Sequence, residues 1–237
     1  MAAADDMPPL AATDWRVFRI IASRFPPVSI FDLVTDPGDL DDVFEIEALT
    51  NDRIRAEVGN LALVPAEDRV VGPGATPIMA AFTHLNPDGS RFCDPSFGAY
   101  YAALAIETAV AETIHHREAM LAASAETAGR PIDVDMRCYV ASLNGDLHDV
   151  RAFSADHPLL LDPGSYAASQ TFGASLRKAG SNGIIYPSVR HEGGVCVAVY
   201  RPKCLSDCTQ ERHLTYQWDG QRISSVYEKR DFDPKPS

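Results

Sequence analysis

Three side chains in the middle of the chain carry groups that could bind and cleave a charged ligand. Glu112 is a carboxylate within an apolar stretch, residues 109–114, so it either faces solvent or lies in a polar site. Tyr101 precedes it by eleven residues. That spacing is about three helical turns, so a helix that began at Tyr101 would point both side chains the same way. Arg91 adds a guanidinium, which can bind an anionic group through two parallel hydrogen bonds.

A second polar cluster follows a predicted strand near residue 185. Residues 180–183 (Gly-Ser-Asn-Gly) predict a turn, and the strand after it contains Pro187, which cannot donate a hydrogen bond to a neighbouring strand. Ser188 is therefore expected where backbone donors are free, with Arg190 on the same side of the strand. The alternative interpretation is an edge strand that carries a surface arginine.

A mixture of helices and strands must position these groups. Residues 106–123 have no proline and are rich in Ala, Glu and Met, which predicts a helix, and residues 166–179 predict a second helix that stops at Gly180. The dipeptides of turns predict hairpins at 144–146 and 219–220. The predicted strands are 15–21, 132–143, 147–153, 183–190, 194–200, 214–218 and 222–227. One α+β domain accounts for the whole chain.

Composition and charge exclude several classes of protein. The 237 residues are 46% hydrophobic and 23% charged, which is typical of a globular chain. The net charge of −12 argues against sequence-independent binding of nucleic acid, which depends on a positive surface. No apolar run approaches the roughly 18 residues of a membrane span, and the acidic N-terminus is unlike a signal peptide. We therefore expect a cytoplasmic protein without membrane or direct nucleic-acid contacts.

The cysteines and histidines favour structural over catalytic roles. Five widely spaced cysteines are typical of free thiols in a reducing compartment. Cys204 and Cys208, with His213 nearby, could form half a zinc site, but a structural site needs four ligands, so we expect no metal. His115 and His116 would point about 100 degrees apart on a helix, which disfavours an RNA-cleaving acid–base pair.

Taken together, several segments resemble the RES domain family, named for its Arg, Glu and Ser. The resemblance runs from about Trp15 to Tyr227. The chain departs from the family pattern where Ser90 follows the glycine before Arg91 and where Cys-Asp-Pro follows Phe92. The matching segments are 15–19 (Trp-Arg-Val-Phe-Arg), 89–92 (Gly-Ser-Arg-Phe), 101–112 and 183–190, the last followed by Gly193 and Gly194.

The resemblance implies a RES domain over residues 14–230, with flexible tails at 1–13 and 231–237. It implies an ADP-ribosyltransferase-like fold, which is α+β with a mixed or antiparallel split β-sheet core and flanking helices. It also implies the toxin of a bacterial type II toxin–antitoxin pair, which breaks the nicotinamide–ribose bond of NAD with water or inorganic phosphate as acceptor. The alternatives are ADP-ribosylation of a host protein and a catalytically inactive binding module. The implied partner is an Xre-like helix-turn-helix antitoxin that covers the active site, and a homodimer is left open.

The residue types suit this chemistry. A carboxylate stabilises the cation that develops on the ribose as neutral nicotinamide leaves, as in glycoside cleavage. A guanidinium binds the pyrophosphate, and an aromatic ring stacks on the cationic nicotinamide. The first family arginine is Arg19 or Arg24. The predicted catalytic residues are Glu112, Arg91 and Tyr101, and the predicted NAD-binding residues are Arg19, Arg91, Tyr101, Ser188 and Arg190.

Overall fold

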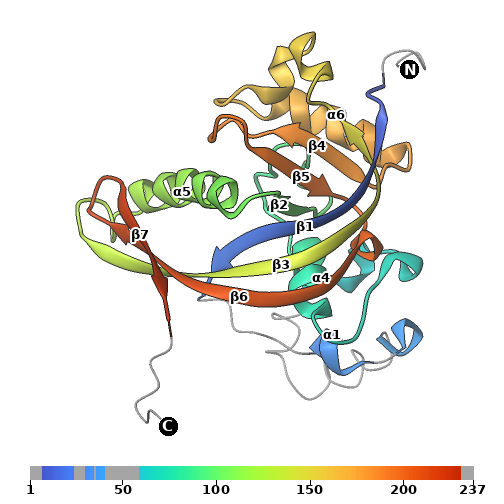
Figure 1. The fold of residues 1–237 in the computed structure, drawn as a ribbon, viewed down its shortest axis with the longest axis horizontal. Helices are drawn as coiled ribbons and strands as arrows, with labels where there is room; N and C mark the ends of the chain where they lie inside the picture. Colours follow the sequence, from blue (N-terminus) through green and yellow to red (C-terminus); the bar gives the residue numbers. More distant parts are fainter. Residues whose placement is uncertain (1–6, 24–29, 35, 41–58, 231–237) are drawn as a thin grey trace.

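One mixed β-sheet organises the chain, for which the computed structural model describes residues 7–23, 30–34, 36–40 and 59–230 (Figure 1). The strand order is β1-β2-β5-β4-β3-β6-β7. The strands are β1 (Leu10–Ala22), β2 (Tyr100–Ala103), β3 (Ile132–Asp149), β4 (Gly183–Pro187), β5 (Val195–Val199), β6 (Leu205–Trp218) and β7 (Ile223–Lys229). The α-helices are α1 (Ile30–Leu33), α4 (Ala75–Thr83), α5 (Ile106–Ala123) and α6 (Ala167–Lys178). Short 3-10 turns are Pro37–Asp39, Leu61–Leu63, Ala66–Asp68, Phe153–Ala155, Pro158–Leu161 and Pro202–Cys204.

The sheet is split into two halves. Long antiparallel pairings join β1, β3, β6 and β7 in one half, and β2, β5 and β4 form the other half. A single residue pair, Phe18 with Ala103, joins β1 to β2. On the other side β4 joins β3 through two parallel pairs, of which the first is Ile184 with His148. Because β1 also pairs with β3, five strands close into a ring, and the predicted α+β fold with a mixed, split sheet is confirmed.

Two hydrophobic clusters fill the two sides of the sheet. Side chains alternate between the faces of a strand, so neighbours in β2 contribute to different clusters. Tyr100 and Ala102 belong to the cluster that includes Phe31 and the buried side of α4. Ala103 belongs to the other cluster, against which Tyr101 packs. The short strand therefore points two adjacent tyrosines in opposite directions, and only Tyr101 is directed toward α5.

Helices α5 and α6 agree closely with the helices predicted from the sequence. In Figure 1, α5 lies along the long curved strands, and it packs against both β1 and β2. Glu112 lies near the middle of α5, but Tyr101 belongs to β2. Tyr101 therefore lies on the strand before the helix, and the three-turn spacing that a shared helix would give does not apply to this pair. The strand ends at Ala103, and Ala105 is still extended before the helix begins.

The predicted hairpin at residues 144–146 was wrong. Strand β3 continues through Asn144 and Gly145, which pair with Asp14 and Thr13 of β1. The long neighbouring strand supplies hydrogen bonds to this segment, so the local turn preference of the sequence is overridden. Strand β1 itself begins at Leu10, before the predicted domain start at residue 14.

The remaining expectations concern Arg24, the C-terminal tail, membrane spans, cysteines and metal sites. Arg24 and residues 231–237 lie outside the described residues. Within the described ranges, no helix is both long and apolar enough to cross a membrane. All five cysteines are free and buried. The described residues contain no group of three or more His, Cys, Asp or Glu side chains that could hold a metal ion.

Candidate active site

A single large cleft contains most of the predicted site. Its volume is about 1370 Å³, and its lining includes Arg19, Arg91, Tyr101 and Glu112. These residues come from β1, the loop before β2, β2 itself and α5, so the split between the half-sheets brings them together. Ligand pockets usually occupy about 300–1,000 Å³, so this cleft is large enough for a dinucleotide.

Glu112 is held by a hydroxyl from a distant part of the chain. Ser188 Oγ donates a hydrogen bond of 2.6 Å to Glu112 Oε1. The same Oγ accepts hydrogen bonds from the backbone N–H groups of Arg190, at 3.1 Å, and His191, at 3.0 Å. Because both lone pairs of the hydroxyl are occupied by backbone donors, its proton is directed at the carboxylate. Ser188 therefore orients the Glu112 carboxylate, although Ser188 itself does not line the cleft.

The thiol of Cys196 is a second donor to the same carboxylate. Its Sγ lies 3.8 Å from Glu112 Oε1. Burial, and then the nearby negative charge of Glu112, raise the pKa of Cys196, so the thiol stays protonated and donates. Cys196 is also among the residues that line the cleft. The Glu112 carboxylate is thus partly exposed to the cleft, while one of its oxygens accepts from a hydroxyl and a thiol.

The turn after β4 positions Ser188. Pro187 is the last residue of β4, and the Ser188 N–H donates to the carbonyl of Gly194 across the turn. His191 in this turn lies within 2.8 Å of the Thr108 hydroxyl on α5. The turn is therefore attached to the helix that carries Glu112. The edge-strand interpretation was wrong, because β4 lies between β5 and β3, and Pro187 is tolerated because it ends the strand.

Arg91 is fixed by a strained turn and by backbone acceptors. Phe92, which follows it, has a φ of 66°, a conformation uncommon for a residue with a side chain. The hydroxyl of Tyr101 donates to the Arg91 carbonyl at 2.6 Å. The guanidinium donates to the carbonyls of Leu160 (3.0 Å) and Asp162 (2.9 Å). Arg91 is only 6% exposed, so it contributes a fixed positive charge from the wall of the cleft.

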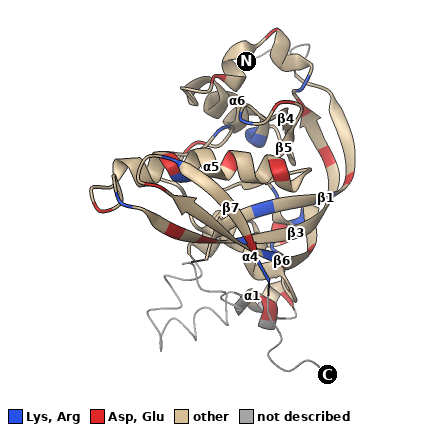
Figure 2. Cartoon of the chain, turned by 60° about the vertical axis from the view of Figure 1, so that its left-hand side comes forward, with Lys and Arg blue, Asp and Glu red and all other residues tan. Residues whose placement is uncertain are grey.

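Arg19 is a second positive charge in the cleft, and none of the carboxylates that the structure describes is its partner. Its guanidinium donates to the Tyr101 carbonyl at 3.0 Å and lies over the ring of Tyr100, 4.8 Å from the ring centre. No carboxylate oxygen of the described residues lies within 4.0 Å of it, and burial lowers the pKa of Arg19. A desolvated cation without a counter-charge favours binding of an anion. Figure 2 shows acidic residues along α5, the neighbouring element.

Arg190 lies outside the cleft lining, although the sequence predicts that it binds the ligand. It belongs to the turn after β4, and its guanidinium donates to the Pro163 carbonyl at 2.8 Å. Sequence reasoning also missed several aromatic residues of the cleft, among them Tyr166 and Tyr186. Tyr186 stands two residues before Ser188, which on a strand places it on the same face, so its position could have been inferred. Nothing near Tyr166 in the sequence signals its place.

The fold and the cleft define an α+β protein with a carboxylate, two guanidinium groups and aromatic rings around one dinucleotide-sized hollow. Residues 66–219 match the model of the RES domain, and the chain belongs to the RES domain family.

Two known proteins show how far the similarity extends. The chain is 32% identical over 210 residues to the "Uncharacterized protein y4oC" of Sinorhizobium fredii, which covers 89% of this chain and 86% of that protein. It is similar to a chain in the crystal structure of the M. tuberculosis MbcT–MbcA toxin–antitoxin complex, with 13% identity and a TM-score of 0.44. That match covers 85% of this chain and 86% of the other.

Proposed function

We propose that this protein breaks the bond between nicotinamide and ribose in NAD, and that it acts in the cytoplasm as the toxin of a toxin–antitoxin pair. The observation that carries the proposal is the Glu112 carboxylate, held by Ser188, in the same cleft as the guanidinium of Arg19, which has no carboxylate partner among the described residues. Membership of the RES domain family supports it. The implied partner is an Xre-like antitoxin that covers the cleft.

Cleavage of this bond depends on stabilising the positive charge that develops on the ribose, because nicotinamide leaves as a neutral molecule and needs no proton from an acid. When the glycosidic C–N bond of NAD breaks, the electron pair goes to the nicotinamide nitrogen, and the base leaves as a neutral molecule. The positive charge moves to the ribose ring, where an oxocarbenium-like transition state forms. The negative charge of Glu112 stabilises that charge from the cleft wall, and the hydrogen bond from Ser188 fixes the direction of the carboxylate.

The remaining side chains bind and orient the substrate. Arg19 is the proposed partner of the pyrophosphate, because its charge is desolvated and lacks a carboxylate among the described residues. Arg91 adds positive potential, although two of its N–H groups already donate to backbone carbonyls. Tyr101 is the proposed contact for nicotinamide through its ring, since its hydroxyl is used by Arg91.

The acceptor that captures the ribosyl cation determines the type of reaction. Water yields ADP-ribose and a proton, inorganic phosphate yields ADP-ribose phosphorylated on the ribose, and a protein side chain yields an ADP-ribosylated protein. All three reactions share the same bond cleavage, and all three require Glu112. The acceptor is therefore a separate question from the cleavage itself.

Nicotinamide release from NAD tests the proposal directly. The purified protein is incubated with NAD, with and without inorganic phosphate, and the products are separated by chromatography. We expect the native protein to release nicotinamide and Glu112→Gln, which keeps the size of the side chain, to release it about 10²- to 10³-fold more slowly. Equal release by the two proteins would show that the cleft does not cleave NAD. Labelled NAD added to a lysate would mark a discrete band only if a protein is the acceptor.

A further inference from the structure

Residues 158–166, which we call the strap, carry one of the aromatic rings that line the cleft, that of Tyr166. Two arginines from distant parts of the chain hold the strap through its backbone. Arg91 donates to the carbonyls of Leu160 and Asp162, and Arg190 donates to that of Pro163 at 2.8 Å. The strap ends at Tyr166, the residue before α6. Both arginines therefore determine where the Tyr166 ring lies.

Tyr166 differs from Tyr101, another tyrosine of the cleft, in the use of its hydroxyl. The hydroxyl of Tyr101 donates a hydrogen bond to the carbonyl of Arg91 inside the fold. No described residue forms a hydrogen bond with the hydroxyl of Tyr166, although its backbone carbonyl accepts one from Ser169. The ring lines the cleft and is only partly buried. The fold thus fixes this ring without using its polar group.

One face of the Tyr166 ring is already occupied by a cation. The Arg91 guanidinium carbon lies 4.8 Å from the ring centre, in the geometry of a cation–π contact. Arg91 would repel a second cation placed on the opposite face of the Tyr166 ring. Arg91 does not repel a neutral, electron-rich aromatic ring, and such a ring can stack on the face of Tyr166 that Arg91 does not cover.

We propose that Tyr166 is the side chain that stacks on the adenine ring of the substrate and so determines its specificity. This inference rests on the proposed function, because it assigns one end of NAD to the strap. The nicotinamide ring of NAD carries a positive charge, which disfavours it beside Arg91, whereas adenine is neutral. Adenine is remote from the bond that breaks, so its binding contributes equally to the ground state and the transition state. Loss of such an interaction raises KM and leaves kcat unchanged.

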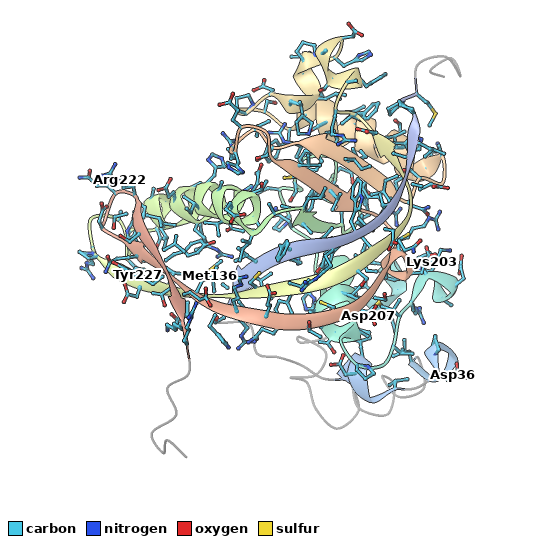
Figure 3. All side chains as sticks on the ribbon, in the orientation of Figure 1. Asp36, Met136, Lys203, Asp207, Arg222 and Tyr227 are labelled. Carbon is cyan, nitrogen blue, oxygen red and sulfur yellow. The ribbon has the colours of Figure 1, made fainter. Side chains whose placement is uncertain are left out.

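Ligand binding by Tyr166 variants tests the inference. Two probes separate the ends of the substrate: ADP-ribose, which contains adenine, and nicotinamide mononucleotide, which does not. We expect Tyr166→Leu to weaken ADP-ribose binding, measured by calorimetry, by about 10-fold or more, since stacked bases depend strongly on the aromatic ring. Tyr166→Phe should bind ADP-ribose as the native protein does, and nicotinamide mononucleotide should bind equally to all three. Tyr227→Leu is the matched control, because Tyr227 is exposed on β7 at the edge of the sheet (Figure 3).

Two results would overturn the inference. One is unchanged ADP-ribose binding by Tyr166→Leu, and the other is an equal loss of both probes. Melting temperatures identify a folding defect, and Tyr166→Met, of similar volume, replaces leucine if one appears. Failure of the proposed function is distinguishable, because it is read from nicotinamide release by the native protein. If the native protein releases nicotinamide with a KM that Tyr166→Leu leaves unchanged, only the assignment of Tyr166 fails.

Discussion

Replacing Ser188 with alanine tests whether the orientation of Glu112 matters for cleavage of NAD. The distance of 2.6 Å between Ser188 Oγ and Glu112 Oε1 is that of a charge-assisted hydrogen bond. Such a bond contributes about 1.5–3 kcal/mol. Because about 1.4 kcal/mol of transition-state energy is a factor of ten in rate, we expect kcat for nicotinamide release to fall about 10- to 150-fold. KM should change little, since Ser188 does not line the cleft.

One further variant, together with a measurement of stability, separates orientation from folding. Ser188 also accepts hydrogen bonds from two backbone N–H groups, so alanine should lower the free energy of unfolding by about 1–3 kcal/mol. Ser188→Thr keeps the hydroxyl and should retain activity.

A double-mutant cycle measures the coupling between the two side chains. Glu112→Gln alone should lower kcat by about 10²- to 10³-fold. Adding Ser188→Ala to that variant should cause little further loss, because the carboxylate that the hydroxyl orients is gone. Steady-state nicotinamide release and thermal melting are measured for all four proteins. An equal loss of kcat from Ser188→Ala in both backgrounds would refute the reasoning.

Three other predictions concern charge, pH and close packing. Arg19→Met should raise the KM for NAD about 10-fold or more with unchanged melting temperature, since it removes a partly buried cation that has no carboxylate partner in the described chain. An unchanged KM would argue against a pyrophosphate contact. Burial lowers the pKa of His148, so as pH falls below about 6.5 the unfolded chain takes up a proton that the folded chain resists, and stability is lost. Urea unfolding between pH 7 and pH 5 should show a weaker pH dependence for His148→Gln. Gly173→Ala would place Cβ 2.1 Å from the Phe92 carbonyl oxygen and should destabilise the protein by about 2 kcal/mol, whereas Gly164→Ala, which has room, should not.

Local sequence patterns predicted the helices better than the strands. Residues 106–123 formed α5 as expected, because a long run of good helix formers without proline has few alternatives. The Asn144–Asp146 segment did not turn, because its backbone groups pair with β1 more than a hundred residues away in sequence. A local pattern contains no information about such a partner, so the length of β3 could not be predicted.

The composition of the site could be predicted, but its connections could not. The residue types and the family resemblance indicated Glu112 and Ser188, which the structure joins by a hydrogen bond across 76 positions of sequence. The same reasoning assigned Arg190 to the ligand, whereas its guanidinium holds the backbone of Pro163. Tyr166 was missed because its place depends on Arg91, a contact between distant segments.

The connection between the half-sheets, a single residue pair between β1 and β2, determines where a bound ligand would most increase local stability. Only the pair Phe18–Ala103 connects β1 to β2, and Arg19 and Tyr101 are near neighbours of that pair on the two strands. A molecule that contacts both side chains would link the two half-sheets at the place where a single residue pair joins them. Amide hydrogen exchange at β2 should then slow on ligand binding more than exchange in the long β3–β6 ladder, which has its own extensive pairing.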